Sequence, residues 1–485
     1  MSGYWERISQ SRLSRRTAVA RLGVAGAGVA ALSLVGCGGD SSSGSNSSSG
    51  ASNGLVTNPE DTTAKAKAGG TLKTFASADA TSFDPIGDGT STVYGQISAY
   101  AYLRLLKFAT AKYPKTATGD VEPDGAESYE VSPDKMQVTF KIRQGQKWDP
   151  RAPTNGRVMD AQDVLATWNR FAKVSPNKAD VIYDAAIAPF GPVDTVSAPD
   201  NNTVIFKLKT PDASFLPLIA YNRNFYIMPK EADGGFDPRK DIRGNGPWTL
   251  ANAVPSAGRT WKRNADYYVK GRPFSDSIEV PVVSEYATQL AQFKAGNIYT
   301  SVARQEDVVQ TKGDVPGTIL GLDSAYSGIS SVVVFGYDGD SPFKDERVRQ
   351  AVSRAIDRET LANVINNRDK LKADGLDLQT RYHTIINASW EGFWIDPLDS
   401  KKFGPNGVFY QYSIAESKKL LAAAGFPNGF DTNLFYNGGT QYGTTYSRSA
   451  DLLAGMLPDI GIRAKQSPKD YQTEYLPNYH YAYTP

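Results

Sequence analysis

The chain of 485 residues contains a single cysteine, Cys37. One cysteine cannot form a disulfide within the chain, so buried apolar side chains must hold the fold together. The sequence supplies them, because 40% of its residues are hydrophobic and 11% are aromatic, as in globular proteins with a substantial core. A chain of this length is too long for one small core, so we expect two or three packed units.

The first 36 residues have the pattern of an export signal. Residues 1–21 carry five arginines and one acidic residue, and residues 22–36 are uncharged and mostly apolar. The apolar segment is shorter than the ~20 residues that a transmembrane helix needs. A basic start followed by a short apolar stretch is typical of a secretory signal peptide. The pair Arg15 and Arg16 indicates the twin-arginine route of bacterial export.

The position of Cys37 favours lipid attachment. Residues 34–37, Leu-Val-Gly-Cys, resemble the lipobox of bacterial lipoproteins, and this resemblance implies that Cys37 is lipidated and becomes the mature N-terminus. Acyl chains would then anchor the protein, since each buried CH₂ group contributes about 0.8 kcal/mol. The serine- and glycine-rich residues 37–68 are expected to be a flexible tether. The alternative is an ordinary signal peptide in which the cysteine has no role.

The charge balance gives no indication of a nucleic-acid partner. The formal net charge is +2 with neutral histidines, and removal of residues 1–36 leaves 48 basic against 50 acidic side chains. No cluster of Lys and Arg is interleaved with aromatic residues, so we expect no nucleic-acid partner. We expect an exported protein on the outer face of the bacterial cytoplasmic membrane, at the cell surface or in the periplasm.

Strand and helix patterns alternate along the chain. Alternating apolar residues predict half-buried strands at 71–75, 136–142, 204–208 and 278–282, and a continuous apolar run predicts a fully buried strand at 329–335. Apolar residues at helical spacing behind capping residues predict helices at 160–173, 345–356 and 413–425. Interleaved strands and helices indicate an α/β protein.

Common catalytic and metal-binding motifs are absent from the sequence. The chain has only two histidines, His383 and His480, which removes most histidine-based metal sites and catalytic triads. It contains no P-loop, no H-E-x-x-H and no G-x-S-x-G sequence. We therefore predict that the protein is not an enzyme and that it has no catalytic residue, no metal site and no cofactor.

Aromatic residues gather towards the end of the chain. Trp390 and Trp394 lie close together, and several tyrosines follow, among them Tyr436 beside Asn437. Tyrosine and tryptophan combine apolar area with a polar tip, which favours a pocket for a ligand of mixed character. We take these four residues as candidate ligand contacts. The alternative is core packing in a tyrosine-rich protein.

Six segments of the chain, taken in order, resemble the patterns of one family. They are residues 121–129 (P-x-L-A-x-S-W), 139–148 (T-F-x-L-R-x-G-x-K-W), 160–164 (T-A-x-D-V), 244–248 (G-T-G-P-Y), 264–268 (N-P-x-Y-W) and 343–358 (F-x-D-x-R-V-R-Q-A-x-x-x-A-I-D-R). The family is the extracytoplasmic solute-binding proteins of peptide-type ABC importers, the oligopeptide- and dipeptide-binding branch. The resemblance covers residues 69–466.

The resemblance implies a two-lobed α/β fold of the type II periplasmic-binding-protein kind, with an extra small subdomain and a hinge between the lobes. The expected division is 1–36 signal peptide, 37–68 lipidated cysteine and tether, 69–114 with 185–322 lobe I, 115–184 small subdomain, and 323–485 lobe II. Gly244 and Gly246 match the family's hinge loop, where glycine permits dihedral changes. Asn245, Thr90 and Ser91 are taken as ligand contacts by the same resemblance.

The implied function is capture of peptides or similar small solutes in the cleft between the lobes and their delivery to a membrane permease. The partners are the solute, the ABC permease and its ATPase subunits, and the membrane through the lipid anchor. The binding protein itself is expected to be a monomer. Two alternatives stay open: a binder of the same fold for a nickel chelate, an opine or a sugar, and a lipid-anchored extracellular hydrolase with paired cleft carboxylates.

The sequence departs from the family pattern in two places. An insertion-like stretch covers residues 149–158. Family members also continue past the strand that follows Gly461 and carry a W-x-x-D-Y stretch, whose Asp holds the ammonium group of a peptide. The sequence ends at Pro485 before any such stretch. We therefore expect either a lobe II that is truncated at its C-terminus or a branch of the family that differs there.

Overall fold

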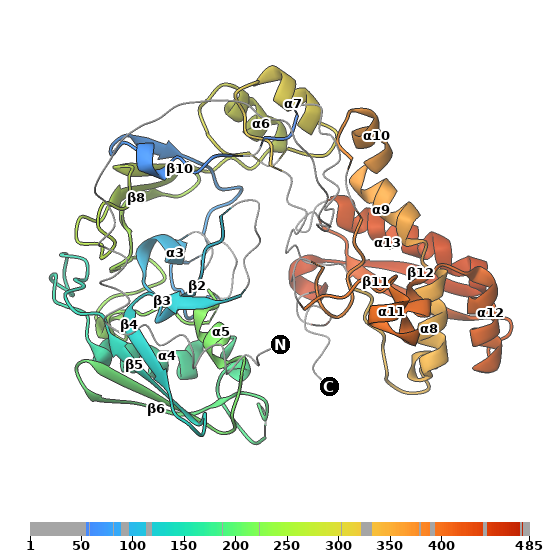
Figure 1. The fold of residues 1–485 in the computed structure, drawn as a ribbon, viewed down its shortest axis with the longest axis horizontal. Helices are drawn as coiled ribbons and strands as arrows, with labels where there is room; N and C mark the ends of the chain where they lie inside the picture. The colour runs from blue at the N-terminus through green and yellow to red at the C-terminus, as the bar shows by residue number, and fades with distance from the viewer. Residues whose placement is uncertain are drawn as a thin grey trace, which may run out of the picture.

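A computed structural model gives the fold of the chain (Figure 1). It describes residues 55–57, 59–80, 82–88, 97–112, 119–186, 188–222, 224–301, 303–321, 332–377, 380–388, 393–439, 444–475 and 478. Buried apolar side chains form two separate clusters, one between Ala76 and Val280 and the other between Val348 and Ile462. We name the two units lobe I and lobe II. The prediction of more than one packed unit with α/β content is confirmed.

Lobe I contains a four-stranded mixed sheet, named sheet A, with the strand order β1-β10-β9-β8. Its strands are β1 (Thr71–Lys73), β8 (Trp248–Val254), β9 (Gly258–Arg263) and β10 (Ser277–Pro281). Strand β1 runs parallel to β10, whereas the other neighbours are antiparallel. The strands predicted near 71–75 and 278–282 are therefore confirmed. The long segment between β1 and β8 leaves sheet A and returns to it.

That segment forms an antiparallel sheet with the order β4-β5-β7-β6. Its strands are β4 (Ala126–Val131), β5 (Gln137–Ile142), β6 (Val193–Asp200) and β7 (Thr203–Leu208). The strands predicted at 136–142 and 204–208 are confirmed. The expected end of the small subdomain at 184 lies too early, because β7 pairs with both β5 and β6. We place this end after Leu208.

Smaller elements lie between the two sheets of lobe I in Figure 1. They are α3 (Ser98–Ala101), the paired strands β2 (Leu106–Phe108) and β3 (Val121–Pro123), and α5 (Phe215–Ala220). Buried residues of α3, of α5 and of both sheets belong to one apolar cluster. The small subdomain and sheet A therefore share a core.

Helix α4 (Ala161–Val174) packs on the sheet of the small subdomain and begins as predicted. The Asp160 carboxylate accepts the backbone N–H groups of Gln162 and Asp163, and the Asp163 carboxylate accepts the N–H of Asp160 in return. This reciprocal capping satisfies donors that the first helical turn leaves open. The apolar face of the helix, including Val164 and Phe171, is buried.

The Asp163 side chain is fully buried and has several donors. Its carboxylate accepts the indole N–H of Trp148 at 3.0 Å, the backbone N–H of Lys230 at 3.0 Å and the guanidinium of Arg157, whose Nη2 lies 2.5 Å from Oδ1. Arg157 also pairs with Glu231 at 2.6 Å. These contacts join α4 to the insertion-like stretch 149–158, which is therefore an integral part of lobe I.

Lobe II consists of a two-stranded parallel sheet with helices around it. Its elements are α8 (Glu346–Ala355), α9 (Arg358–Asn366), α10 (Arg368–Ala373), α11 (Ser400–Phe403), α12 (Ile414–Ala423), β11 (Phe430–Asn437), α13 (Thr444–Met456) and β12 (Ile462–Lys469). The predicted starts of α8 and α12 are confirmed, since Asp345 accepts the N–H of Arg347 and Ser413 accepts that of Glu416. Helices α6 (Tyr286–Lys294) and α7 (Val308–Asp314) lie between the lobes in Figure 1.

The prediction of a fully buried strand at 329–335 is wrong for the part that the structure describes. Residues 332–335 form no strand, and Val332 and Val334 are 65% and 49% exposed. An apolar run becomes a buried strand only where a sheet receives it on both sides. The described sheet of lobe II contains only β11 and β12, and neither pairs with this run.

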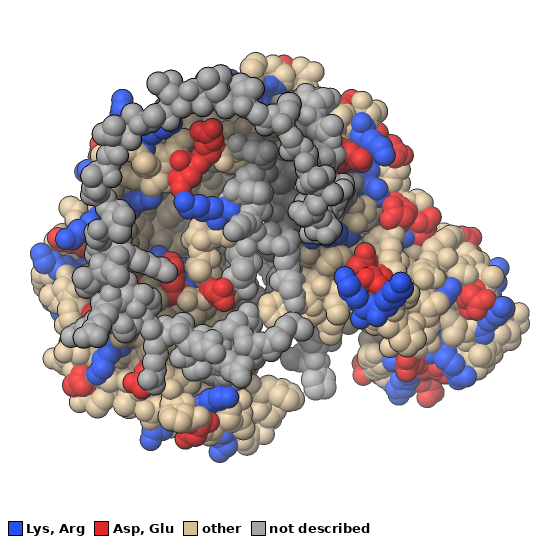
Figure 2. Space-filling view, viewed as in Figure 1, with Lys and Arg blue, Asp and Glu red and all other residues tan. Residues whose placement is uncertain are grey.

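The described surface is mixed in charge. On the face shown in Figure 2, Lys and Arg are interspersed with Asp and Glu, without one large patch of a single sign. Within the described residues, no helix combines the length and the apolar character that crossing a bilayer requires.

The Asp163 contacts generate a stability prediction. Asp163→Ala should lower the free energy of unfolding by about 3–5 kcal/mol, because it removes the acceptor of Trp148 and Lys230 and one of the two carboxylate partners of Arg157. Urea unfolding of the purified chain measures this loss. The matched control is Asp237→Ala, which removes a half-exposed carboxylate paired with the exposed Arg239 and should lower the unfolding free energy far less. Equal losses in the two variants would contradict the structural role of Asp163.

Candidate functional site

The loop that contains Gly244 and Gly246 lies inside lobe I, against α3. The N–H of Gly246 donates to the carbonyl of Ala101 at 2.7 Å, and the N–H of Asp149 donates to the carbonyl of Gly244 at 2.9 Å. A Cβ atom at Gly246 would lie 2.7 Å from the carbonyl carbon of Ala101, and one at Gly244 would clash with the carbonyl oxygen of Ala101. Glycine is needed here for close backbone packing.

The predicted hinge role of Gly244 and Gly246 is therefore wrong. The apolar core of lobe I includes residues before and after this loop, and β8, β9 and β10 of sheet A follow it in the chain. A hinge must lie where the chain passes from one core to the other. In this structure that passage lies between β10 and α8.

The side chain of Asn245, in the same loop, also forms its hydrogen bonds within the protein. It is only 1% exposed, its Oδ1 accepts the N–H of Leu103 at 3.2 Å, and its Nδ2 donates to the sulfur of Met159 at 3.0 Å. Both polar atoms of the side chain have protein partners. The residue braces the loop against its neighbours and does not face a solute, contrary to the prediction.

The described candidate contacts in lobe II differ from one another in burial. The indole N–H of Trp394 donates to the carbonyl of Tyr382 at 3.0 Å, and the hydroxyl of Tyr436 donates to Gln466 on β12 at 2.9 Å. Both side chains are half-buried. Asn437 is fully buried, and its Oδ1 accepts the N–H of Gly439 at 2.8 Å, so it supports the turn after β11 instead of facing solvent. Four other candidates lie outside the described residues: Cys37, Thr90, Ser91 and Trp390.

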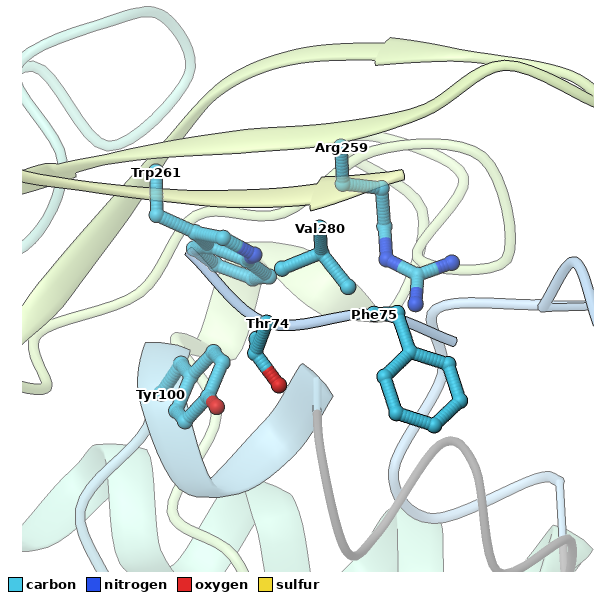
Figure 3. Close-up of a pocket in the computed structure, with 6 residues that line it drawn as sticks. All are labelled: Thr74, Phe75, Tyr100, Arg259, Trp261 and Val280. Atoms are coloured by element: carbon cyan, nitrogen blue, oxygen red, sulfur yellow. The ribbon is translucent and has the colours of Figure 1, made fainter. Parts of the chain in front are cut away.

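A small pocket in lobe I brings together side chains that the sequence analysis did not select. Its volume is about 50 Å³, and Figure 3 shows the residues around it. They come from the residues just after β1, from α3, and from the centre of sheet A: Thr74, Phe75, Tyr100, Arg259, Trp261 and Val280. The lining thus combines two hydroxyls, a guanidinium and an apolar surface.

Strand register explains why these side chains meet. Val280 on β10 pairs with Arg259 on β9, and Ile278 pairs with Trp261. Side chains two residues apart on a strand share a face, so Arg259 and Trp261 project to the same side of sheet A. Tyr100 on α3 lies on that side, with its ring edge-on to Trp261 at a centroid distance of 5.5 Å.

Gly258 fixes this register at the start of β9. Its φ angle is +137°, and a Cβ atom there would lie 2.7 Å from the Cα of Pro281 on β10. Only glycine fits this combination of backbone angle and close approach. The residue after it, Arg259, is thereby set opposite Val280.

Arg259 is buried without a charged partner among the residues that the structure describes. Its side chain is 6% exposed, and its Nη2 atom is buried with no hydrogen-bond partner. Burial lowers the pKa of the guanidinium, and this effect is opposed by Asp79 and Tyr100. Burial also raises the pKa of the Tyr100 hydroxyl, which is therefore protonated at neutral pH and able to donate. The pocket accordingly offers hydrogen-bond donors and a positive charge.

A second hollow lies on the surface of lobe II. It has a volume of about 550 Å³ over β11 and β12, and its lining includes the exposed ion pair of Arg463 and Asp431 at 2.6 Å. Lys465 adds a third charged side chain to the lining. Within the described part of the chain, no group of three His, Cys, Asp or Glu side chains is placed to hold a metal ion.

Solved structures identify the class of fold. The periplasmic binding protein DppA from Helicobacter pylori, in complex with the peptide STSA, superposes with a TM-score of 0.60 at 20% identity, over 85% of this chain and 76% of that one. The architecture is therefore that of the type II periplasmic binding proteins, as the sequence motifs implied.

The sequence comparisons identify the family. The model of the bacterial extracellular solute-binding proteins, family 5 (middle region), matches residues 120–483. The chain is 26% identical over 412 residues to heme-binding protein A of Haemophilus influenzae, covering 79% of this chain and 67% of the relative. It is 24% identical over 399 residues to the dipeptide-binding protein of Escherichia coli, covering 79% and 69%. The chain belongs to the family 5 extracellular solute-binding proteins, which confirms the resemblance.

The loop analysis generates a prediction that separates packing from hinge motion. Gly246→Ala should lower the free energy of unfolding by about 1–3 kcal/mol, because its new methyl group meets the backbone of α3. Gly317→Ala is the control, since a Cβ atom there has no neighbour within 4 Å. Urea unfolding of both variants measures the difference. A Gly246→Ala variant of unchanged stability would contradict the packing role.

Proposed function

We propose that this protein is the solute-capturing subunit of an ABC importer for peptides or related small solutes. Membership of the solute-binding family supports the class of function. The observation that carries the proposal is the pair of separate apolar cores, because two independently packed lobes can close on a solute held between them. The protein performs no reaction of its own, and ATP is used by the partner subunits.

Capture in this proposal is a shift between open and closed arrangements of the lobes. A solute favours closure only by as much as it binds the closed form better than the open form. Lobe I contributes the pocket on sheet A. Lobe II contributes Trp394 and Tyr436, each of which keeps part of its ring exposed. Thr90, Ser91 and Trp390 remain candidate contacts.

The proposal includes the organisation of the whole chain. Residues 1–36 act as the export signal, Cys37 carries the lipid, and residues up to 68 tether the lobes to the outer face of the cytoplasmic membrane. Lobe I and its small subdomain precede lobe II, with the subdomain ending after Leu208. The mature protein docks as a monomer on a permease.

Membership of the family indicates a small-solute binder but does not identify the solute. The matched relatives bear names that include heme and dipeptide, so the family fold alone does not select the ligand. Peptides are the first class to test. An opine, a sugar or a nickel chelate is the alternative within the same fold, and a lipid-anchored hydrolase is the alternative of another class.

Thermal unfolding of the full chain tests the proposed function. The additives are a mixture of di- to pentapeptides, a mixture of sugars, and nickel with and without a small chelator. A solute at about 100 times its dissociation constant adds roughly 2.7 kcal/mol to the unfolding free energy, which shifts the midpoint by several degrees. We expect the peptide mixture to raise the midpoint. A midpoint that none of the additives moves would contradict the proposal.

The anchor is tested separately by Cys37→Ser. In cells that produce the full chain, the variant should move from the membrane fraction to the soluble exported fraction, because the thiol that carries the lipid is gone. Immunoblots of the fractions, taken after a salt wash, measure the distribution. Retention of the variant in the washed membrane would show that Cys37 is not the anchor.

A further inference from the structure

Arg259 differs from Arg243, the other buried arginine of lobe I, and from the half-buried Arg157 and Arg170. Each of these three has an acidic partner, which is the usual condition for burying a charge. The pairs are Arg157 with Asp163, Arg170 with Asp84, and Arg243 with Asp241. No ion pair joins Arg259 to any acid among the described residues, although its side chain is 94% buried. The pocket therefore contains a buried guanidinium that no acid of the described residues neutralises.

Asp79 does not neutralise this guanidinium. Its side chain is exposed, and its Oδ2 accepts the backbone N–H of Ser256 at 2.6 Å, at the start of the turn that leads into β9. Asp79 influences Arg259 only through its field. The Nη2 atom of Arg259 stays without a hydrogen-bond partner.

The pocket surrounds Arg259 with groups that suit a carboxylate. Figure 3 shows the hydroxyls of Tyr100 and Thr74 on the side of the pocket opposite the guanidinium. The Thr74 hydroxyl shares a hydrogen bond with Thr300 at 3.0 Å and still has capacity for another partner. The rings of Phe75 and Trp261 form the apolar part of the lining.

The size of the pocket limits what can enter. A volume of about 50 Å³ exceeds the ~15 Å³ that a cavity needs to hold one water molecule, but it is far below the volume of a ligand-sized cavity. One end group of a solute fits, and the remainder of the solute must lie outside. A guanidinium holds a planar carboxylate with two parallel hydrogen bonds, which favours a carboxylate over a rounder anion.

We propose that Arg259 binds a carboxylate of the captured solute, with Tyr100 and Thr74 as additional hydrogen-bonding groups. The inference rests on the proposed function and deepens it, because it defines the imported class as solutes with a free carboxylate at one end. A peptide C-terminus and a small organic acid share this chemistry. The charge that the free protein leaves unpaired is satisfied by the solute.

The test compares Arg259→Gln with Arg263→Gln in the full chain. Arg263 lies on the same strand, but it is exposed and pairs with Asp276 at 2.9 Å. The probes are di- to pentapeptides with free C-termini, the same peptides as C-terminal amides, succinate, and inorganic phosphate. Calorimetric titration gives the affinity of each probe, and thermal unfolding gives the stability of each variant without additives.

We expect Arg259→Gln to weaken binding of the carboxylate probes by at least about tenfold, as for loss of a buried hydrogen-bonded charge partner. Binding to wild type should fall by a similar factor when peptides are amidated, and Arg263→Gln should bind as wild type does. If the peptides with free C-termini bind most tightly, the bound group is a peptide C-terminus. If succinate is the only probe that binds tightly, the solute is a small organic acid. Without additives, Arg259→Gln should unfold at the same temperature as wild type or higher, because it loses no ion pair.

Four results would overturn the inference. If wild type binds peptides and Arg259→Gln binds them equally tightly, the proposed function stands and the role of Arg259 fails. If Arg259→Gln unfolds many degrees lower than wild type, the guanidinium has a structural role. If phosphate binds wild type more tightly than every carboxylate probe, the class of anion is wrong. If wild type binds no probe at all, the proposed function fails together with this inference.

Discussion

The geometry of lobe I depends on the buried carboxylate of Asp163. It holds the start of α4, the indole of Trp148 and the stretch 149–158 in one place. From there, backbone hydrogen bonds lead to the functional region. Asp149 donates to the loop 244–247, that loop donates to the end of α3, and α3 carries Tyr100 into the pocket on sheet A. A charge buried far from the pocket in sequence thus sets the position of one of its walls.

Arg157 and Arg259 serve opposite purposes in this lobe. Arg157 is paired, and its ion pairs fix the fold. Arg259 is unpaired, which costs stability in the free protein and is available as binding free energy when a negative group enters. Binding sites are commonly the places where a protein departs from the rules that stabilise it elsewhere. The separation of the two roles lets a rigid lobe present one unsatisfied charge to a solute.

The sequence predicted the features that depend on local patterns. The helices capped by Asp160, Asp345 and Ser413 follow from capping residues, and the strands β1, β5, β7 and β10 of lobe I follow from apolar spacing. The features that depend on tertiary packing were missed. Gly244 has the composition of a hinge, but its position against α3 makes it a packing residue. Arg259 has one local signal, because it shares a strand face with a core tryptophan, and only the structure shows that no acid of the described residues pairs with it.

The central claim is that two separately packed lobes close on a solute. Spin labels at position 173 on α4 and position 418 on α12, both exposed, report the distance between the lobes in a chain that also carries Cys37→Ser. Pulsed electron–electron double resonance would be recorded before and after addition of a solute that raises the unfolding temperature. The account predicts a shorter and narrower distance distribution in the presence of that solute. An unchanged distribution with the solute bound would contradict it.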